Sequence, residues 1–181
     1  MKSLRLFVLM CVGFFILAPY SIVHAGSRAG AAAFTIGAGD YYFATKRHIA
    51  NTGVGYGALG YDFTDHWGIE GLAGFMNTTS HQSQDNGKSV KGSILAIDGV
   101  YHFSAYKIVE PYISAGPGLI YLSPNGNDAH VEGNVNAALG LQFFVDKAVA
   151  LRVEAHDFYT IVGGKNDIFL NGGVTLLWDI C

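Results

Sequence analysis

The chain has few cysteines and few charged side chains. Only two of its 181 residues are cysteine, Cys11 and Cys181, and charged residues make up 14% of the sequence. Cys11 lies in an N-terminal segment that we expect to be removed, and Met10 stands before it where a lipid-modified cysteine needs a small residue. The single cysteine that remains excludes an intrachain disulfide. A domain whose whole surface meets water usually carries more charge than this.

Long apolar runs are confined to the N-terminus. Residues 1–25 have a basic start, a short apolar core followed by Pro19, and the small residue Ala25 before Gly26. These features are typical of a secretory signal peptide that is cleaved before Gly26. No later run reaches the roughly 18 apolar residues that a spanning helix needs. We therefore expect a signal peptide at 1–25 and a single domain at 26–181.

The chain is mildly acidic, and this excludes partners that need a basic surface. Removal of residues 1–25 takes away Lys2 and Arg5 and changes the formal net charge from −3 to −5. We therefore expect no nucleic-acid partner. The glycines at 37–39 do not continue into a nucleotide-binding fingerprint, and the histidines lack the close spacing of metal ligands. We expect neither a cofactor nor a metal.

The clearest pattern in the sequence is strict alternation between residues 132 and 160. In its second half, Leu151 and Val153 alternate with Arg152 and Glu154. Successive side chains of a strand point to opposite faces of the sheet, so apolar and polar residues separate. Residues 145–148 interrupt the pattern as a turn. The stretch predicts a β-hairpin with one apolar and one polar face.

The rest of the domain repeats this unit. Each predicted strand is long enough to cross a bilayer when tilted, and helical periodicity is absent. We therefore predict an all-β fold, an eight-stranded antiparallel up-and-down transmembrane β-barrel. The predicted strands are 33–44, 52–63, 67–78, 91–103, 111–122, 132–144, 148–159 and 168–180.

The predicted connections alternate in length. The shorter ones are 64–66, 104–110 and 145–147, and the longer ones are 45–51, 79–90, 123–131 and 160–167. Turn tripeptides lie at 85–87 and 125–127. We expect short turns in the periplasm and four longer loops outside. Aromatic residues near the strand ends indicate girdles at the membrane interfaces; they are Tyr41, Tyr42, Tyr61, Phe63, Trp67, Phe75, Tyr101, Phe103, Tyr112, Tyr121, Phe143, Phe158, Tyr159 and Trp178.

The main alternative to a membrane barrel is a soluble barrel in the periplasm that binds a lipid. Alternation alone does not say which face of a barrel points outward. The polar faces here carry mainly Gly, Asn, Ser and Ala with isolated charges, whereas a sheet facing water carries many long charged side chains. The composition therefore favours the outer membrane of a Gram-negative bacterium.

Three segments resemble a known family of small outer-membrane β-barrels, typified by the transmembrane domain of OmpA. They are Pro111–Gly118, Leu151–Glu154 and Asn171–Leu176. The resemblance implies contact with outer-membrane lipid and lipopolysaccharide, and insertion by the outer-membrane assembly machinery. It also implies loops able to bind a surface ligand. The family usually ends on Phe or Trp, whereas this chain ends on Cys181.

Isolated charges on the polar faces are the candidate site. Glu70, Asp98, Arg152 and Glu154 should share a narrow lumen, where buried charge is stable only when it is paired. Such a network is either a plug of ion pairs that fills the barrel or a selectivity element of a narrow pore. We favour the plug, and with it a structural or surface-interaction role.

An enzyme that modifies lipid A is a further alternative. One type of lipid A deacylase carries a serine two residues after a histidine, but here His156 is followed at that spacing by Phe158. Asp98, His102 and Ser104 are close in sequence and include the residue types of a palmitoyltransferase, yet Ser104 falls in a predicted periplasmic turn. Catalysis needs a nucleophile beside a base at the correct face. We therefore expect no enzymatic activity.

Overall fold

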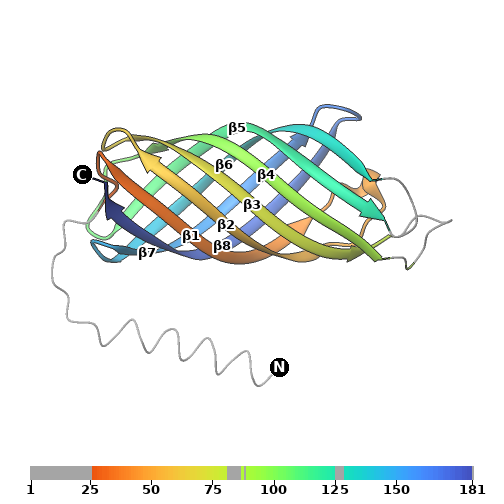
Figure 1. Cartoon of the computed structure of the whole chain (residues 1–181), viewed down its shortest axis with the longest axis horizontal. Coiled ribbons are helices and arrows are strands. Elements are labelled where there is room, and N and C mark those ends of the chain that lie inside the picture. Colours follow the sequence, from red (N-terminus) through yellow and green to blue (C-terminus); the bar gives the residue numbers. More distant parts are fainter. Residues whose placement is uncertain (1–25, 81–86, 88, 125–128, 181) are drawn as a thin grey trace, which may run out of the picture.

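The described strands form one closed barrel in a computed structural model. It describes residues 26–80, 87, 89–124 and 129–180. The predicted signal peptide, most of the turn tripeptide 85–87 and all of 125–127 lie outside the described residues. Neighbouring strands pair antiparallel in sequence order, and the last strand pairs with the first (Figure 1). The predicted eight-stranded up-and-down barrel is confirmed.

All eight strands lie where alternation predicts them. Their ends differ from the predicted ones by no more than three residues. A short 3₁₀ turn, η1 (Thr45–Arg47), follows the first strand, and no helix in the described part of the chain is long and apolar enough to span a membrane. The strands are β1 (Ala31–Tyr42), β2 (Thr52–Asp62), β3 (Trp67–Thr79), β4 (Ser89–His102), β5 (Val109–Pro124), β6 (His130–Asp146), β7 (Val149–Thr160) and β8 (Lys165–Asp179).

Each strand turns one set of side chains into the barrel and the other set outward. On β7, Arg152 is 3% exposed and Glu154 is buried, whereas Val153 between them is 47% exposed. On β6, Leu139 is 66% exposed and faces outward with its apolar neighbours. The predicted faces of this hairpin are therefore present, with apolar side chains on the outer wall and polar ones in the lumen.

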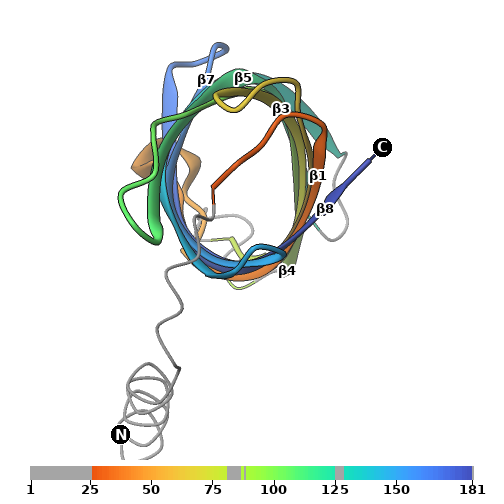
Figure 2. The same ribbon diagram turned by 90° about the vertical axis from the view of Figure 1, so that its left-hand side faces the viewer.

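The two ends of the barrel differ. At one end, here called the terminal end, lie both described chain ends and the short connections at 63–66, 103–108 and 147–148. Figure 2 looks into this end and shows the chain before β1 running across the opening. The opposite end, here called the loop end, carries η1 and the connection 161–164.

The aromatic residues divide between the outer wall and the lumen, which corrects the predicted girdle. Most of them are exposed near the barrel ends, as expected, but Tyr41, Tyr112 and Phe158 are buried inside. Neighbours such as Tyr41 and Tyr42 point to opposite faces because of the strand period. Position near a strand end therefore does not decide on which face an aromatic residue lies.

The lumen is polar over only part of its length, which corrects the expectation of a polar interior throughout. Toward the loop end it is filled by an apolar layer of buried side chains. Tyr41 packs on Phe43 and Phe169 at ring-centroid distances of 4.8 and 6.0 Å. The apolar layer consists of Tyr41, Phe43, Val54, Tyr56, Ala58, Leu72, Met76, Val90, Ile94, Ala96, Ile120, Leu122, Phe158 and Phe169.

Candidate functional site

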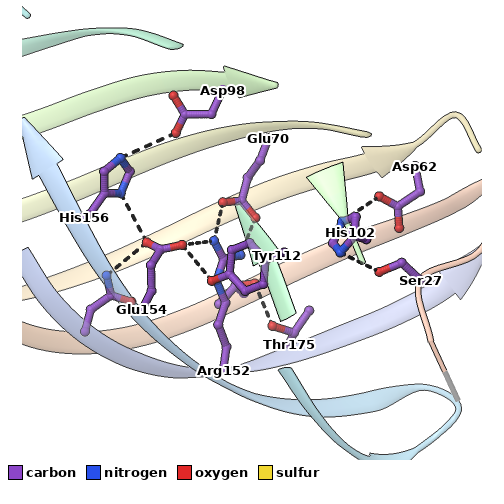
Figure 3. Close-up of polar contacts among 12 residues, drawn as sticks. Ser27, Asp62, Glu70, Asp98, His102, Tyr112, Arg152, Glu154, His156 and Thr175 are labelled. Atoms are coloured by element: carbon purple, nitrogen blue, oxygen red, sulfur yellow. Dashed lines mark hydrogen bonds and ion pairs between the residues drawn. The ribbon is translucent and has the colours of Figure 1, made fainter. Parts of the chain in front are cut away.

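A charge pair crosses the middle of the lumen. Arg152 on β7 reaches Glu70 on β3, and its Nη1 and Nη2 donate hydrogen bonds of 2.5 and 2.8 Å to the two carboxylate oxygens (Figure 3). Nη2 also donates to Glu154 at 2.5 Å. The guanidinium carbon lies 4.7 Å from the centre of the Tyr112 ring, a cation–π distance. Arg152 is thus held by two carboxylates and one aromatic face.

Glu154 connects this pair to the rest of the interior. Its Oε2 accepts a hydrogen bond of 2.7 Å from the Tyr112 hydroxyl, and its Oε1 accepts one of 3.1 Å from Asn171 Nδ2. The ring Nδ1 of His156 lies 3.2 Å from the same Oε1. A buried carboxylate is stable only when such partners replace water. Glu154 therefore serves as the hub of the central network.

Asp98 lies at the edge of the network. Its Oδ2 is 3.8 Å from His156 Nε2, and that nitrogen also contacts Asn136 Oδ1 at 2.7 Å. No hydrogen-bond partner is found for Asp98 Oδ1 among the described residues. The structure thus places all four predicted residues in the lumen. It joins Arg152 directly to both glutamates and reaches Asp98 only through His156.

A second polar cluster closes the terminal end, and sequence reasoning missed most of it. Glu110 Oε1 accepts a hydrogen bond of 2.6 Å from Ser27 Oγ and lies 2.9 Å from His102 Nδ1. His102 Nε2 lies 3.4 Å from Asp62 Oδ1 on its other side. Ser27 comes from the segment before β1 and was outside every predicted strand. Asp62 and Glu110 sit at strand ends, where the alternation is too short to assign a face.

This terminal-end cluster contains a serine, a histidine and a carboxylate, but its geometry is that of a structural seat. Ser27 is 8% exposed, and its hydroxyl donates to Glu110 at 2.6 Å and also lies 3.0 Å from His102 Nδ1. The adjoining cavity of about 20 Å³ has room for little more than a water molecule, which needs roughly 10–15 Å³. Ser104, the serine predicted to lie in a periplasmic turn, is exposed on the connection after β4, and the polar partners found for the His102 ring among the described residues are Ser27, Asp62 and Glu110.

A third polar group closes the loop end, centred on Arg47 of η1. Its Nε donates to both oxygens of Asp167 at 3.0 and 2.9 Å, and its Nη1 donates to Glu132 Oε2 at 2.7 Å. Its Nη2 donates to Thr160 Oγ1 at 2.7 Å. Burial by itself lowers the pKa of the Arg47 guanidinium, but the bonds to Asp167 and Glu132 raise that pKa above its ordinary value. Arg47 therefore ties the connection after β1 to β6, β7 and β8 at this end of the barrel, and is here called the Arg47 latch. The alternation of the strands did not predict it because Arg47 lies in a connection.

Taken along the barrel axis, the described side chains fill the lumen. The Arg47 latch lies at the loop end and is followed by the apolar layer, the central network and the terminal-end cluster. Within the described residues, no group of three or more His, Cys, Asp or Glu side chains is arranged to hold a metal ion. The arrangement is suited to holding the eight strands together through their interior.

Comparison with known proteins agrees with this architecture. Residues 7–174 match the family described as outer membrane protein beta-barrel domain. The N-terminal β-barrel domain of OprF from Pseudomonas aeruginosa is similar, with a TM-score of 0.62 and 18% identity over 83% of this chain and 98% of that chain. Neisserial surface protein A gives 0.63 and 15% over 82% and 97%, and Ail of Yersinia pestis gives 0.59 and 15% over 83% and 99%. No curated protein matches the sequence.

Proposed function

Because the chain belongs to the outer membrane protein beta-barrel domain family, we propose that it is a non-enzymatic outer-membrane protein with a structural or surface-interaction role. Its exposed apolar wall contacts membrane lipid and lipopolysaccharide. The signal peptide at 1–25 exports it in a Gram-negative bacterium, and the assembly machinery inserts it with the terminal end in the periplasm. The four connections at the loop end are then extracellular.

The observation that carries this proposal is the Arg152–Glu70 pair across the lumen. Its two partners come from β7 and β3, which lie on opposite sides of an eight-stranded barrel, and both are buried. An interior of this size is just wide enough to be filled by side chains. A solute would have to displace this pair and the apolar layer as well, so the lumen acts as a plug.

A surface role is supported by an apolar tip at the loop end. Ile161 and Val162, in the connection between β7 and β8, are 64% and 72% exposed. Two positive-φ glycines, Gly163 and Gly164, follow them and fix the turn. The hairpin stands out beyond the barrel in Figures 1 and 2. The connection is short, and the strands on either side of it are paired up to Thr160 and Lys165. An exposed apolar turn held in this way is suited to contact with an apolar surface or protein.

Conductance separates the plug from the alternative of a narrow pore. Protein refolded in planar lipid bilayers should give no single-channel steps. A porin of known conductance, reconstituted in the same bilayers, is the control that shows that the assay detects an open lumen. Steady channel activity from the unaltered protein would instead establish the pore.

Two further measurements test the other parts of the proposal. Cells that express Ile161→Ser with Val162→Ser should adhere less to polystyrene, an apolar test surface, than cells expressing the unaltered chain at equal surface level. The mass spectrum of lipid A should be the same with and without the protein. A mass change that depends on the protein would replace the structural role by an enzymatic one.

A further inference from the structure

Residues 26–30 form a stopper in the terminal end of the barrel. Ser27 is buried, and its backbone nitrogen and hydroxyl donate to the two oxygens of Glu110 at 2.8 and 2.6 Å. The nitrogen of Ala29 donates to Asp65 Oδ1 at 3.0 Å, and that of Gly30 donates to the Asp62 carbonyl at 2.8 Å. Figure 2 shows this stretch crossing the opening.

The stopper is also tied to the other side of the same end. Arg28 Nε donates to Asp179 Oδ1 at 2.5 Å, and its Nη1 donates to the Lys147 carbonyl at 3.0 Å. The Gly30 carbonyl accepts a bond of 2.9 Å from the nitrogen of Ile180. The stopper therefore contacts all three short connections or the strand ends beside them, and the end of β8.

The stopper packs against Asp62, His102 and Glu110, here called the seat. These side chains carry more negative than positive charge. Two buried carboxylates, Asp62 and Glu110, flank a single base, His102. Buried carboxylates are stable only when charge and hydrogen bonds compensate them. Even when both ring nitrogens of His102 carry a proton, the ring supplies one positive charge against two carboxylates. The seat then has a net charge of −1.

The first stopper residue brings its backbone against one of these carboxylates. A Cβ added at Gly26 would lie 3.0 Å from Glu110 Oε2, closer than ordinary side chains approach. The α-nitrogen of Gly26 is one bond away from the Cα that carries this position. A positive charge on that nitrogen would therefore be near enough to attract the Glu110 carboxylate.

We propose that the seat binds the α-ammonium group created when the chain is cleaved after Ala25. Hydrolysis of the Ala25–Gly26 peptide bond consumes one water and leaves a carboxylate on Ala25 and an ammonium on Gly26. Before cleavage the same nitrogen is an uncharged amide and does not offset the negative charge of the seat. Cleavage after Ala25 therefore supplies a positive charge that holds residues 26–30 in the end of the barrel. The proposal rests on the predicted cleavage site and is independent of what the loops bind.

Chemical blocking of the terminal amine tests the proposal. Chains starting at Gly26 are refolded in lipid vesicles with a free amine, with an acetylated amine, or with one alanine added before Gly26, and are unfolded across a urea series. Acetylation should raise the unfolding equilibrium constant by about tenfold or more, equivalent to about 1.4 kcal/mol. The added alanine should have a similar effect because it moves the ammonium away from Glu110. Equal urea midpoints for the three chains would overturn the proposal.

Two variants locate the effect at the seat. In Glu110→Gln the difference between free and acetylated chains should fall within error, since the pairing charge is gone. In Asp157→Asn, which alters an exposed carboxylate bonded to Asn166 near the loop end, the full difference should remain. A difference that survives in Glu110→Gln would assign the effect to general charge and overturn the proposal.

Proteolysis gives a second readout that does not depend on refolding of the Glu110→Gln variant. Trypsin should cut after Arg28 faster in the acetylated chain than in the free one, because a stopper that is no longer held exposes that bond. Equal cleavage rates would count against the proposal. N-terminal sequencing of the protein from bacterial envelopes checks the premise separately, and a start other than Gly26 would overturn it.

Discussion

Arg152 and Glu70 face each other across the lumen from β7 and β3, and the guanidinium fork donates to both carboxylate oxygens at 2.5 and 2.8 Å. This bidentate geometry joins opposite walls of the barrel through two buried side chains. The same guanidinium holds Glu154, so its loss would leave two buried carboxylates without a cation. The pair therefore braces the barrel across its lumen, and its removal should weaken both β3 and β7.

Arg152→Met should lower the free energy of unfolding by about 3–5 kcal/mol, the range for removing one partner of a buried ion pair. Combining it with Glu70→Gln should cost less than the sum of the two single changes because the variants share one interaction. Urea unfolding in lipid vesicles measures all three. Arg28→Met is the control, because its pair with Asp179 is exposed and should contribute only about 0.2–1 kcal/mol. Similar losses for both arginines would contradict this bracing role.

The strands and their faces could be predicted because alternation is a local property of the sequence. Leu151 to Glu154 show their faces without knowledge of any other strand. The partner of Arg152 depends instead on how far neighbouring strands are staggered around the barrel, which no local pattern records. Glu70 and Glu154 could thus be named as lumen residues, whereas the bidentate bond to Glu70 needed the structure.

Residues outside the strands explain most of what the sequence did not reveal. Ser27 and Arg47 lie before β1 and in η1, where side-chain direction has no period to follow. The buried aromatic residues differ from these, because the sequence does indicate on which face of the strand they lie. Tyr41 shares its parity with Thr35 on β1, and Thr35 is buried in the lumen. Tyr112 shares its parity with Ser114 in the same way. Parity along the strand would have assigned both tyrosines to the interior.

Leu139→Arg should be far more costly than Val131→Arg. Both side chains are exposed on the outer face of β6, but Leu139 lies mid-strand and Val131 lies near the loop end. An arginine at the bilayer midplane costs about 2–4 kcal/mol, and one near the interface costs about 0–1 kcal/mol. Urea unfolding in vesicles measures the difference. Small and equal losses at both positions would indicate that the wall faces water.

Gly140→Ala should destabilise the barrel because a Cβ there would overlap the Tyr112 ring. Overpacking of this kind costs about 1–3 kcal/mol. Gly133→Ala on the same strand is the matched control, since its Cβ would meet nothing within 4 Å. It should be neutral or stabilising by up to about 1 kcal/mol through the unfolded chain. Tyr112→Leu should reduce the additional cost of Gly140→Ala, and an undiminished cost would mean that the strain lies elsewhere.

Arg47→Met should release the connection 43–51 from the loop end. The loss of stability should be about 1–3 kcal/mol, since Asp167 keeps its bonds from Tyr41 and Ala44, and Glu132 keeps Lys165. Proteinase K added to vesicles should cut this connection faster than in the unaltered protein.

Lys46→Met is the control for the latch, because Lys46 is exposed and its one bond found among the described residues is to the Gly164 carbonyl at 3.2 Å. It should leave both stability and cleavage nearly unchanged. Arg47→Lys should recover only part of the stability, since an ammonium lacks the planar fork that bonds Asp167 and Glu132 together. If Arg47→Lys had the full stability of the unaltered protein, the contribution of Arg47 would come from its charge alone and not from its planar fork.

Cysteine labelling on intact cells should show that the loop end is extracellular. In a Cys181→Ser background, an Ile161→Cys variant should react with a membrane-impermeant maleimide, because Ile161 is exposed at the loop end. A Ser104→Cys variant should react only after the outer membrane is opened, since Ser104 lies in a short connection beside both chain ends. Export leaves short turns on the periplasmic side of such barrels. Labelling of only the Ser104→Cys variant on intact cells would reverse the orientation and remove the hairpin tip from the cell surface, and labelling of neither would contradict surface exposure.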